Sequence, residues 1–144
     1  ALVPEEMQAD IRSSLAALRS RPETTGRKSG ALGYCLGGRL AYTAAAITDV
    51  DAAVAFYGGG IHDQLALAPK LQCPIQFHYG AKDESIPGSA VESVRSAVSD
   101  KNAEVLVYEG ANLGFNCWDR GTYHPNSAAL GHGRALTFLA QHLF

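Results

Sequence analysis

Four short apolar segments alternate with longer helical segments along the chain, and this alternation limits the possible folds more than any other feature. The strand-like segments are residues 29–34, 52–58, 74–80 and 103–110. Each connection between them is long enough to carry the chain back across a sheet, which favours parallel strands. The sequence therefore predicts an α/β fold, a parallel sheet flanked by helices.

Helical segments are expected on both sides of these strands. Pro4 can occupy the first turn of a helix, and apolar residues follow it at helical spacing as far as Leu18. Further helices are expected over residues 37–47, 89–98 and 128–144. In parallel sheets of this kind, ligands bind beyond the carboxyl ends of the strands, so the functional site is expected there.

The composition is that of one globular domain, which we expect to span residues 1–144. The chain has 47% hydrophobic residues and a formal net charge of -2, without a basic run. We therefore expect neither nucleic acid nor a membrane as partner. The apolar stretches are too short to span a bilayer, and the first residues lack the pattern of a signal peptide.

The cysteine pattern favours a reduced, cytoplasmic protein. The three cysteines are an odd number, and no two of them are spaced as in a CxxC motif. This pattern is not that of a disulfide framework or a redox pair. No two pairs of ligands have zinc-finger spacing, so no metal is expected.

The segment GYCLGG, residues 33–38, lies where the first predicted strand runs into a helix. It has the form of a nucleophile elbow with cysteine in place of serine, and glycines two positions either side would permit its tight turn. At a helix N-terminus Cys35 would be favoured as a thiolate, and the N–H of Leu36 would face a developing oxyanion. The alternatives are a buried cysteine in a glycine-packed turn and, less favoured, a phosphate-binding loop, which lacks the Gly-Lys-Ser/Thr that usually follows.

Asp83 follows the third predicted strand, in the chain order nucleophile then acid that α/β-hydrolase triads use. The alternative is an aspartate that bonds its own backbone in a turn. Glu84 is a less favoured candidate for the acid. A histidine should follow the fourth strand to complete a triad.

Four segments together resemble the dienelactone hydrolase family: GYCLGG, AFYGGG, CPIQFHYGAKDESIP and YEGANLGFNCWDRGTY. The resemblance implies a three-layer α/β/α fold, a truncated α/β-hydrolase. It also implies a Cys-His-Asp triad that hydrolyses small-molecule esters or lactones without any cofactor. Position by position, Cys35 matches the nucleophile, Asp83 the acid and Leu36 the oxyanion-hole residue.

The chain departs from the family pattern at the triad base. The family has Gly-Ala-x-His-Gly-Phe after the fourth strand, and Leu113 stands here where the histidine belongs. Leucine cannot accept a proton, so we expect impaired activity, with acylation surviving better than deacylation. His124 is the one replacement worth testing as a base. Packing or solvated roles are expected for His62, His78, His132 and His142.

A second departure is that the N-terminal half of the family pattern is absent from this chain. Residues 29–34 would then form a strand with an unpaired edge, although such a strand is normally interior. An exposed edge invites pairing with another chain, so we expect self-association. The alternative is that the chain is a fragment of a longer protein.

Residues near the expected site are candidates for substrate contacts. Tyr34 and Phe115 could line a pocket, and Arg120 could pair with a substrate carboxylate. A core role is favoured for the aromatic residues, Tyr57 and Trp118 included, and a solvated surface role for Arg120.

Two main hypotheses follow. The first is a hydrolase of carboxylic esters or lactones with a cysteine nucleophile, impaired by Leu113. The alternative is a non-catalytic relative that binds a small ligand or a partner chain. A nucleotide-binding module of flavodoxin-like topology is a distant third, because no phosphate loop follows the first strand.

Overall fold

A four-stranded parallel sheet forms the centre of the computed structural model, which describes residues 2–144. The strands lie in the order β1-β2-β3-β4. Their bounds are Gly30–Tyr34 (β1), Ala52–Phe56 (β2), Ile75–Gly80 (β3) and Ala103–Tyr108 (β4). All three neighbouring pairs are parallel, as predicted from the alternation of strands and helices.

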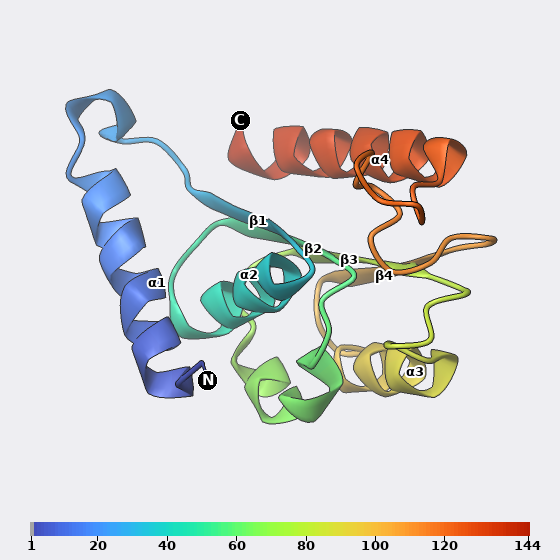
Figure 1. Cartoon of the computed structure of the whole chain (residues 1–144). Helices are drawn as coiled ribbons and strands as arrows, with labels where there is room; N and C mark the ends of the chain where they lie inside the picture. The colour runs from blue at the N-terminus through green and yellow to red at the C-terminus, as the bar shows by residue number, and fades with distance from the viewer. Residues whose placement is uncertain (1) are drawn as a thin grey trace.

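Helices cover both faces of the sheet and make the three layers that the fold class implies (Figure 1). The helices are α1 (Pro4–Arg19), α2 (Leu36–Ile47), α3 (Gly88–Ala97) and α4 (Pro125–Leu143). The crossover helices α2 and α3 lie on one face, and α4 lies alone on the other, against β2 and β3. Helix α1 packs on the outside of α2.

Burial follows the position of each strand. Every residue of β2 and β3 is buried, whereas β1 and β4 have exposed positions. This pattern is typical of a parallel sheet whose central strands are covered on both faces. Within residues 2–144, β1 pairs only with β2, so the edge strand expected there is present.

Helix α4 begins at Pro125, three residues before the predicted start. Proline at the first helical position already has a helical φ, and the side chain of His124 caps the helix by accepting from the N–H of Ser127 at 3.4 Å. Along the described part of the chain, no helix is both long and apolar enough to cross a membrane.

Candidate active site

Cys35 lies between β1 and α2, at the carboxyl end of the sheet. Its backbone has φ 55° and ψ -118°, a combination that non-glycine residues rarely adopt. The Cys35 N–H donates to the carbonyl of Phe56 at 3.0 Å, which ties the turn to the end of β2. The cysteine itself is exposed. The turn therefore presents the thiol outward from a strained backbone, which is the geometry expected of a nucleophile elbow.

Glycines make this turn possible, although not at both positions predicted. A Cβ on Gly33 would overlap the carbonyl of Gly37, and a Cβ on Gly38 would lie 2.5 Å from the carbonyl oxygen of Phe56. Gly37, by contrast, has open space around its missing side chain. The expectation of a steric need for glycine is therefore confirmed at Gly33 and wrong at Gly37. The second close approach is at Gly38.

Leu36 is the first residue of α2, so its N–H has no acceptor within the helix. The N–H groups of Gly38 and Arg39, further along the first turn, are used, because they donate to the Cys35 carbonyl at 3.0 and 3.3 Å. The N–H of Leu36 thus lies at a helix N-terminus directly after the thiol-bearing residue. This is the place from which a backbone donor can stabilise an oxyanion.

Asp83 follows β3 and is 4% exposed. One carboxylate oxygen, Oδ1, accepts from the N–H groups of Ser85 and Ile86 at 2.8 and 2.9 Å. The other oxygen, Oδ2, is buried and has no hydrogen-bond partner. Asp83 therefore has the turn role of the alternative interpretation, and it also keeps one buried oxygen unpaired. Such an oxygen is costly unless something bonds it.

Leu113 lies in the loop after β4, and its side chain packs against the hydrophobic core. The backbone there is held on both sides, since the Leu113 N–H donates to Asn112 Oδ1 and its carbonyl accepts from the Thr122 hydroxyl, both at 2.7 Å. The Lys82 N–H donates to the Ala111 carbonyl at 2.8 Å and joins this loop to the one that carries Asp83. An apolar side chain thus fills the position at which the family resemblance predicts a histidine.

Two histidines near these strands already have other partners. His78 lies inside β3 with Nδ1 2.8 Å from the hydroxyl of Tyr108 and Nε2 2.8 Å from Oε1 of Gln76. Burial, and secondly the charge of Arg134, lower the pKa of His78 to about 3. His124 has Nδ1 2.8 Å from the Ser127 hydroxyl at the start of α4. The structure therefore shows a packed strand histidine and a capping histidine.

The other three histidines do not take the place of the base either. His62 Nε2 lies 3.7 Å from Oδ2 of Asp63. His142 packs edge-on against Phe138, and His132 is exposed on α4. Because Asp83 Oδ2 has no partner, none of the histidines is oriented by the acid. Over residues 2–144, no group of three or more histidine, cysteine or acidic side chains is arranged to hold a metal ion.

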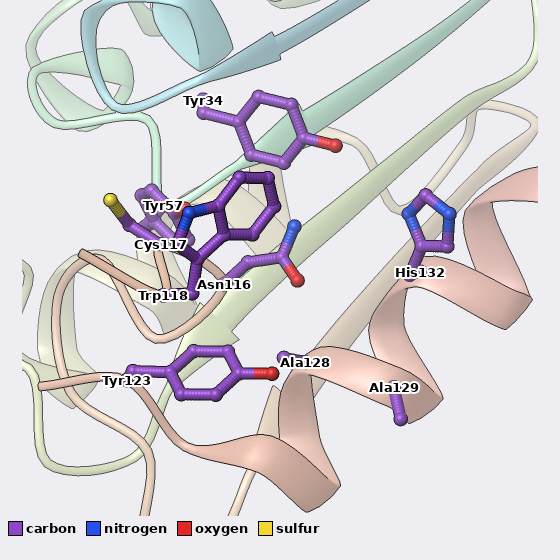
Figure 2. A pocket seen from close by; sticks show the side chains of 9 residues that line it. All are labelled: Tyr34, Tyr57, Asn116, Cys117, Trp118, Tyr123, Ala128, Ala129 and His132. Atoms are coloured by element: carbon purple, nitrogen blue, oxygen red, sulfur yellow. The ribbon is translucent and has the colours of Figure 1, made fainter. Parts of the chain in front are cut away.

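A cavity of about 610 Å³ lies beside the elbow, on the α4 side of the sheet (Figure 2). Its lining residues are Tyr34, Tyr57, Asn116, Cys117, Trp118, Tyr123, Ala128, Ala129 and His132. Tyr34 precedes Cys35, and Tyr57 follows the β2 residue whose carbonyl binds the Cys35 N–H. We call this space the aromatic cavity.

The three proposed substrate contacts lie in different places. Tyr34 lines the aromatic cavity, but Phe115 and Arg120 are not among its described lining residues. Phe115 is fully buried, and Arg120 lies over Gly114, where a Cβ would be 2.9 Å from its Cδ. The core role favoured for the aromatic residues fits Phe115, whereas Trp118 is 85% exposed and is not a core residue.

Sequence reasoning missed some residues that the structure brings to the cavity. Asn116 and Cys117 follow the fourth strand, so the strand-end rule was the available signal for them. Tyr123 and His132 come from the loop before α4 and from α4 itself. Their presence depends on how α4 returns over the sheet, and no local motif reveals that.

Comparison with known proteins gives a consistent family. The dienelactone hydrolase family model matches residues 1–143. The carboxymethylenebutenolidase of Pseudomonas putida is 35% identical over 132 residues, which cover 91% of this chain and 56% of that protein. A putative carboxymethylenebutenolidase of Yersinia pestis is 37% identical over 127 residues, which cover 81% of this chain and 48% of that protein. The chain thus spans about half the length of these curated relatives.

Solved structures agree. The crystal structure of a putative dienelactone hydrolase from Klebsiella pneumoniae matches with a TM-score of 0.86 and 34% identity, covering 93% of this chain and 60% of that one. A dienelactone hydrolase-like promiscuous phosphotriesterase from metagenomic libraries matches with a TM-score of 0.87 at 21% identity. The match covers 96% of this chain and 62% of that one and shows a shared fold. On the extent of the family match and the identity to its members, the chain belongs to the dienelactone hydrolase family.

Proposed function

We propose that the chain is a dienelactone-hydrolase-like enzyme that forms an acyl-enzyme on Cys35 from a carboxylic ester or lactone and releases it slowly. The single observation that carries this proposal is the strained, glycine-dependent elbow that exposes Cys35 directly after Tyr34, a residue that lines the aromatic cavity. Strain of this kind costs about 1–3 kcal/mol and persists where the surrounding structure enforces it. The relatives named carboxymethylenebutenolidase support a lactone or ester as the substrate class.

The first chemical step needs only groups that the chain supplies. The Cys35 thiolate attacks the carbonyl carbon, and the carbonyl oxygen becomes an oxyanion beside the N–H of Leu36. Collapse of this intermediate breaks the bond to the alkoxy group, which leaves and takes up a proton from solvent. Cys35 then carries the acyl group as a thioester. For a lactone, the leaving oxygen remains part of the same acyl group.

The second step needs a base that the described residues do not offer. Water must lose a proton as it attacks the thioester, and a positioned histidine normally accepts it. Leu113 fills that position, and Asp83 Oδ2 has no imidazole to orient. Triad knock-outs in a serine protease lose on the order of 10⁶-fold in rate. Cysteine suffers less in acylation because part of it is thiolate near neutral pH.

Intact-mass spectrometry after addition of 4-nitrophenyl acetate tests this proposal. We expect one added acetyl group that persists for many minutes and is absent from Cys35→Ala. The matched control is Cys73→Ala, which should still be labelled, because burial raises the pKa of the Cys73 thiol and leaves it less reactive. Equal labelling of native protein and Cys35→Ala would refute a special role for Cys35.

A second candidate function is that of a non-catalytic binding protein. The observations that favour it are the apolar residue at the base position and the exposed Trp118 at a ready-made cavity. This candidate predicts that a small ligand binds while no acyl adduct forms on Cys35. Binding measured together with intact mass separates the two functions.

A further inference from the structure

Aromatic rings form most of the wall of the aromatic cavity. Four of its lining residues are Tyr34, Tyr57, Trp118 and Tyr123, and none of its described lining residues is an aspartate, glutamate, lysine or arginine. Figure 2 shows Tyr34 and Tyr123 on opposite sides of the Trp118 indole, with His132 standing apart on α4. A ligand entering this space therefore meets π-faces together with hydroxyl, amide, thiol and imidazole groups.

Two of the tyrosine hydroxyls of the wall are uncharged at neutral pH. Burial raises the pKa of Tyr57 to about 12 and also raises that of Tyr34, so both hydroxyls stay protonated. The side chain of Asn116 partly offsets the effect of burial on the pKa of Tyr34. These groups can fix the orientation of a ligand through hydrogen bonds, but they cannot neutralise a carboxylate.

The indole of Trp118 gives the cavity a large unpaired apolar surface. This side chain is 85% exposed, the most exposed of the cavity's aromatic residues, although tryptophan is usually well buried. An exposed apolar surface at the mouth of a concave site is typical of ligand binding. The volume of about 610 Å³ is within the range of small-molecule pockets.

The aromatic cavity is lined in part by the residue that precedes Cys35, although Cys35 itself is not among its described lining residues. Tyr34 is covalently adjacent to Cys35, and its ring stacks on Phe56 with ring centroids 4.8 Å apart. The Phe56 carbonyl accepts the Cys35 N–H at 3.0 Å, and Tyr57 follows directly. The rings that form the wall and the turn that carries the thiol are thus parts of one hydrogen-bonded and stacked unit.

We propose that the aromatic cavity binds an uncharged aromatic group of the ester substrate, and that the chain discriminates against substrates with a carboxylate in that position. The consequence for reactivity rests on the proposed function, whereas binding to the cavity does not. A carboxylate placed there would lose hydration without gaining a lysine or arginine partner. A neutral ring loses little hydration and gains stacking on Trp118 and its neighbours.

Binding is measured directly, because Trp118 is the single tryptophan of the chain and its fluorescence reports on the cavity. The probes are 3-phenylpropanamide, its 4-carboxyphenyl analogue and its 4-(trimethylammonio)phenyl analogue. We expect all three probes to change the Trp118 fluorescence saturably, but at different concentrations. The neutral probe should bind at least tenfold more tightly than the carboxylate. Equal binding of neutral and anionic probes, or no response to the neutral one, would overturn the proposal. Tightest binding of the cation would overturn it in favour of a cation-binding aromatic site.

A variant pair checks that the cavity is responsible. Tyr123→Ala should weaken binding of 3-phenylpropanamide at least fivefold, whereas Phe144→Ala removes an exposed ring outside the cavity and should leave binding unchanged. Equal affinities of Tyr123→Ala and native protein would contradict the assignment. The comparison of the three probes on the native protein remains decisive even where a variant folds poorly.

Acylation rates then separate the inference from the proposed function. Cys35 is labelled with trifluoroethyl acetate and trifluoroethyl 3-phenylpropanoate, whose leaving group is not aromatic. We expect the phenylpropanoate to acylate at least tenfold faster at equal concentration. Labelling at equal rates would leave the proposed function standing and contradict the inference. Saturable binding of 3-phenylpropanamide without any labelling would support the cavity and contradict the proposed function.

Discussion

At Cys35 the fold holds a non-glycine residue at φ 55°, outside the regions that side chains normally allow. The conformation is enforced by close backbone contacts at Gly33 and Gly38 rather than by the cysteine side chain. The strained backbone of Cys35 is therefore possible because Gly33 and Gly38 have no side chain at these close contacts. A catalytic role of the exposed thiol, as we propose, would explain why the fold keeps this energetic cost of backbone strain.

Gly33→Ala tests this account of the turn. The new methyl group would overlap the Gly37 carbonyl, so the turn must open. We expect a loss of about 2–4 kcal/mol in the free energy of unfolding, typical of severe overpacking, together with slower labelling of Cys35. Urea denaturation and intact mass measure the two effects.

The control is Gly37→Ala, a helical position with open space around it. Alanine is favoured over glycine in helices by about 1 kcal/mol, so this variant should be as stable as the native protein or more so. Equal destabilisation by both substitutions would contradict a specific steric role for Gly33.

At the scale of the elements, the sequence predicts the fold well because each strand and helix has a local signal. Apolar runs mark the four strands, and the lengths of the connections imply parallel pairing. The elbow and Asp83 were predictable because the ends of parallel strands gather at one edge. The exposure of Trp118 could not be predicted, because it depends on the path of an irregular loop against α4.

A stack of rings links the three strands from β2 to β4. Phe56 stacks on His78 with ring centroids 4.1 Å apart, and His78 is parallel to Tyr108 at 5.8 Å. The Tyr108 hydroxyl also hydrogen-bonds the buried Nδ1 of His78 at 2.8 Å. Polar and aromatic contacts therefore reinforce the strand pairing within the core.

Tyr108→Phe keeps the ring and removes this hydrogen bond. The buried Nδ1 of His78 would lose its partner, so we expect a loss of about 1–3 kcal/mol in the free energy of unfolding. Tyr123→Phe is the matched control, since Tyr123 is 39% exposed and should change stability by less than about 0.5 kcal/mol. Comparable losses in the two variants would show that the buried bond is not what stabilises the strands.

At the scale of the whole molecule, the buried His78 makes folding depend on pH. Its folded pKa of about 3 lies below its ordinary value of 6.5, so the unfolded chain binds more protons between these limits. Stability contributed by neutral His78 is complete above about pH 6.5 and is lost as the pH falls toward 3. From pH 7 to pH 5 this linkage corresponds to a loss of about 2 kcal/mol.

Urea denaturation at pH 7 and pH 5 measures this effect. His78→Gln should be less stable at pH 7 but should show a smaller loss between the two pH values than the native protein. The exposed His132→Gln should retain the native pH dependence. An identical pH dependence in native protein and His78→Gln would rule out the proposed origin.

The open edge of the sheet carries a prediction about assembly. Strand β1 pairs only with β2 within residues 2–144, and Leu32 on it is 47% exposed. Unpaired strand edges tend to pair with another chain, so we expect dimers that dissociate on dilution. Size-exclusion chromatography with light scattering measures this, and a monomer at every concentration would contradict it.

The most direct test of the central claim is the lifetime of the acetyl group on Cys35 in native protein, Leu113→His and Leu113→Asn. A histidine at residue 113 would supply a base at the position that the family resemblance predicts for it, whereas an asparagine there is polar but has no basic nitrogen. The account predicts a persistent adduct in native protein and Leu113→Asn, and a lifetime at least a hundredfold shorter in Leu113→His. Equal lifetimes in all three, or no adduct in any of them, would contradict it.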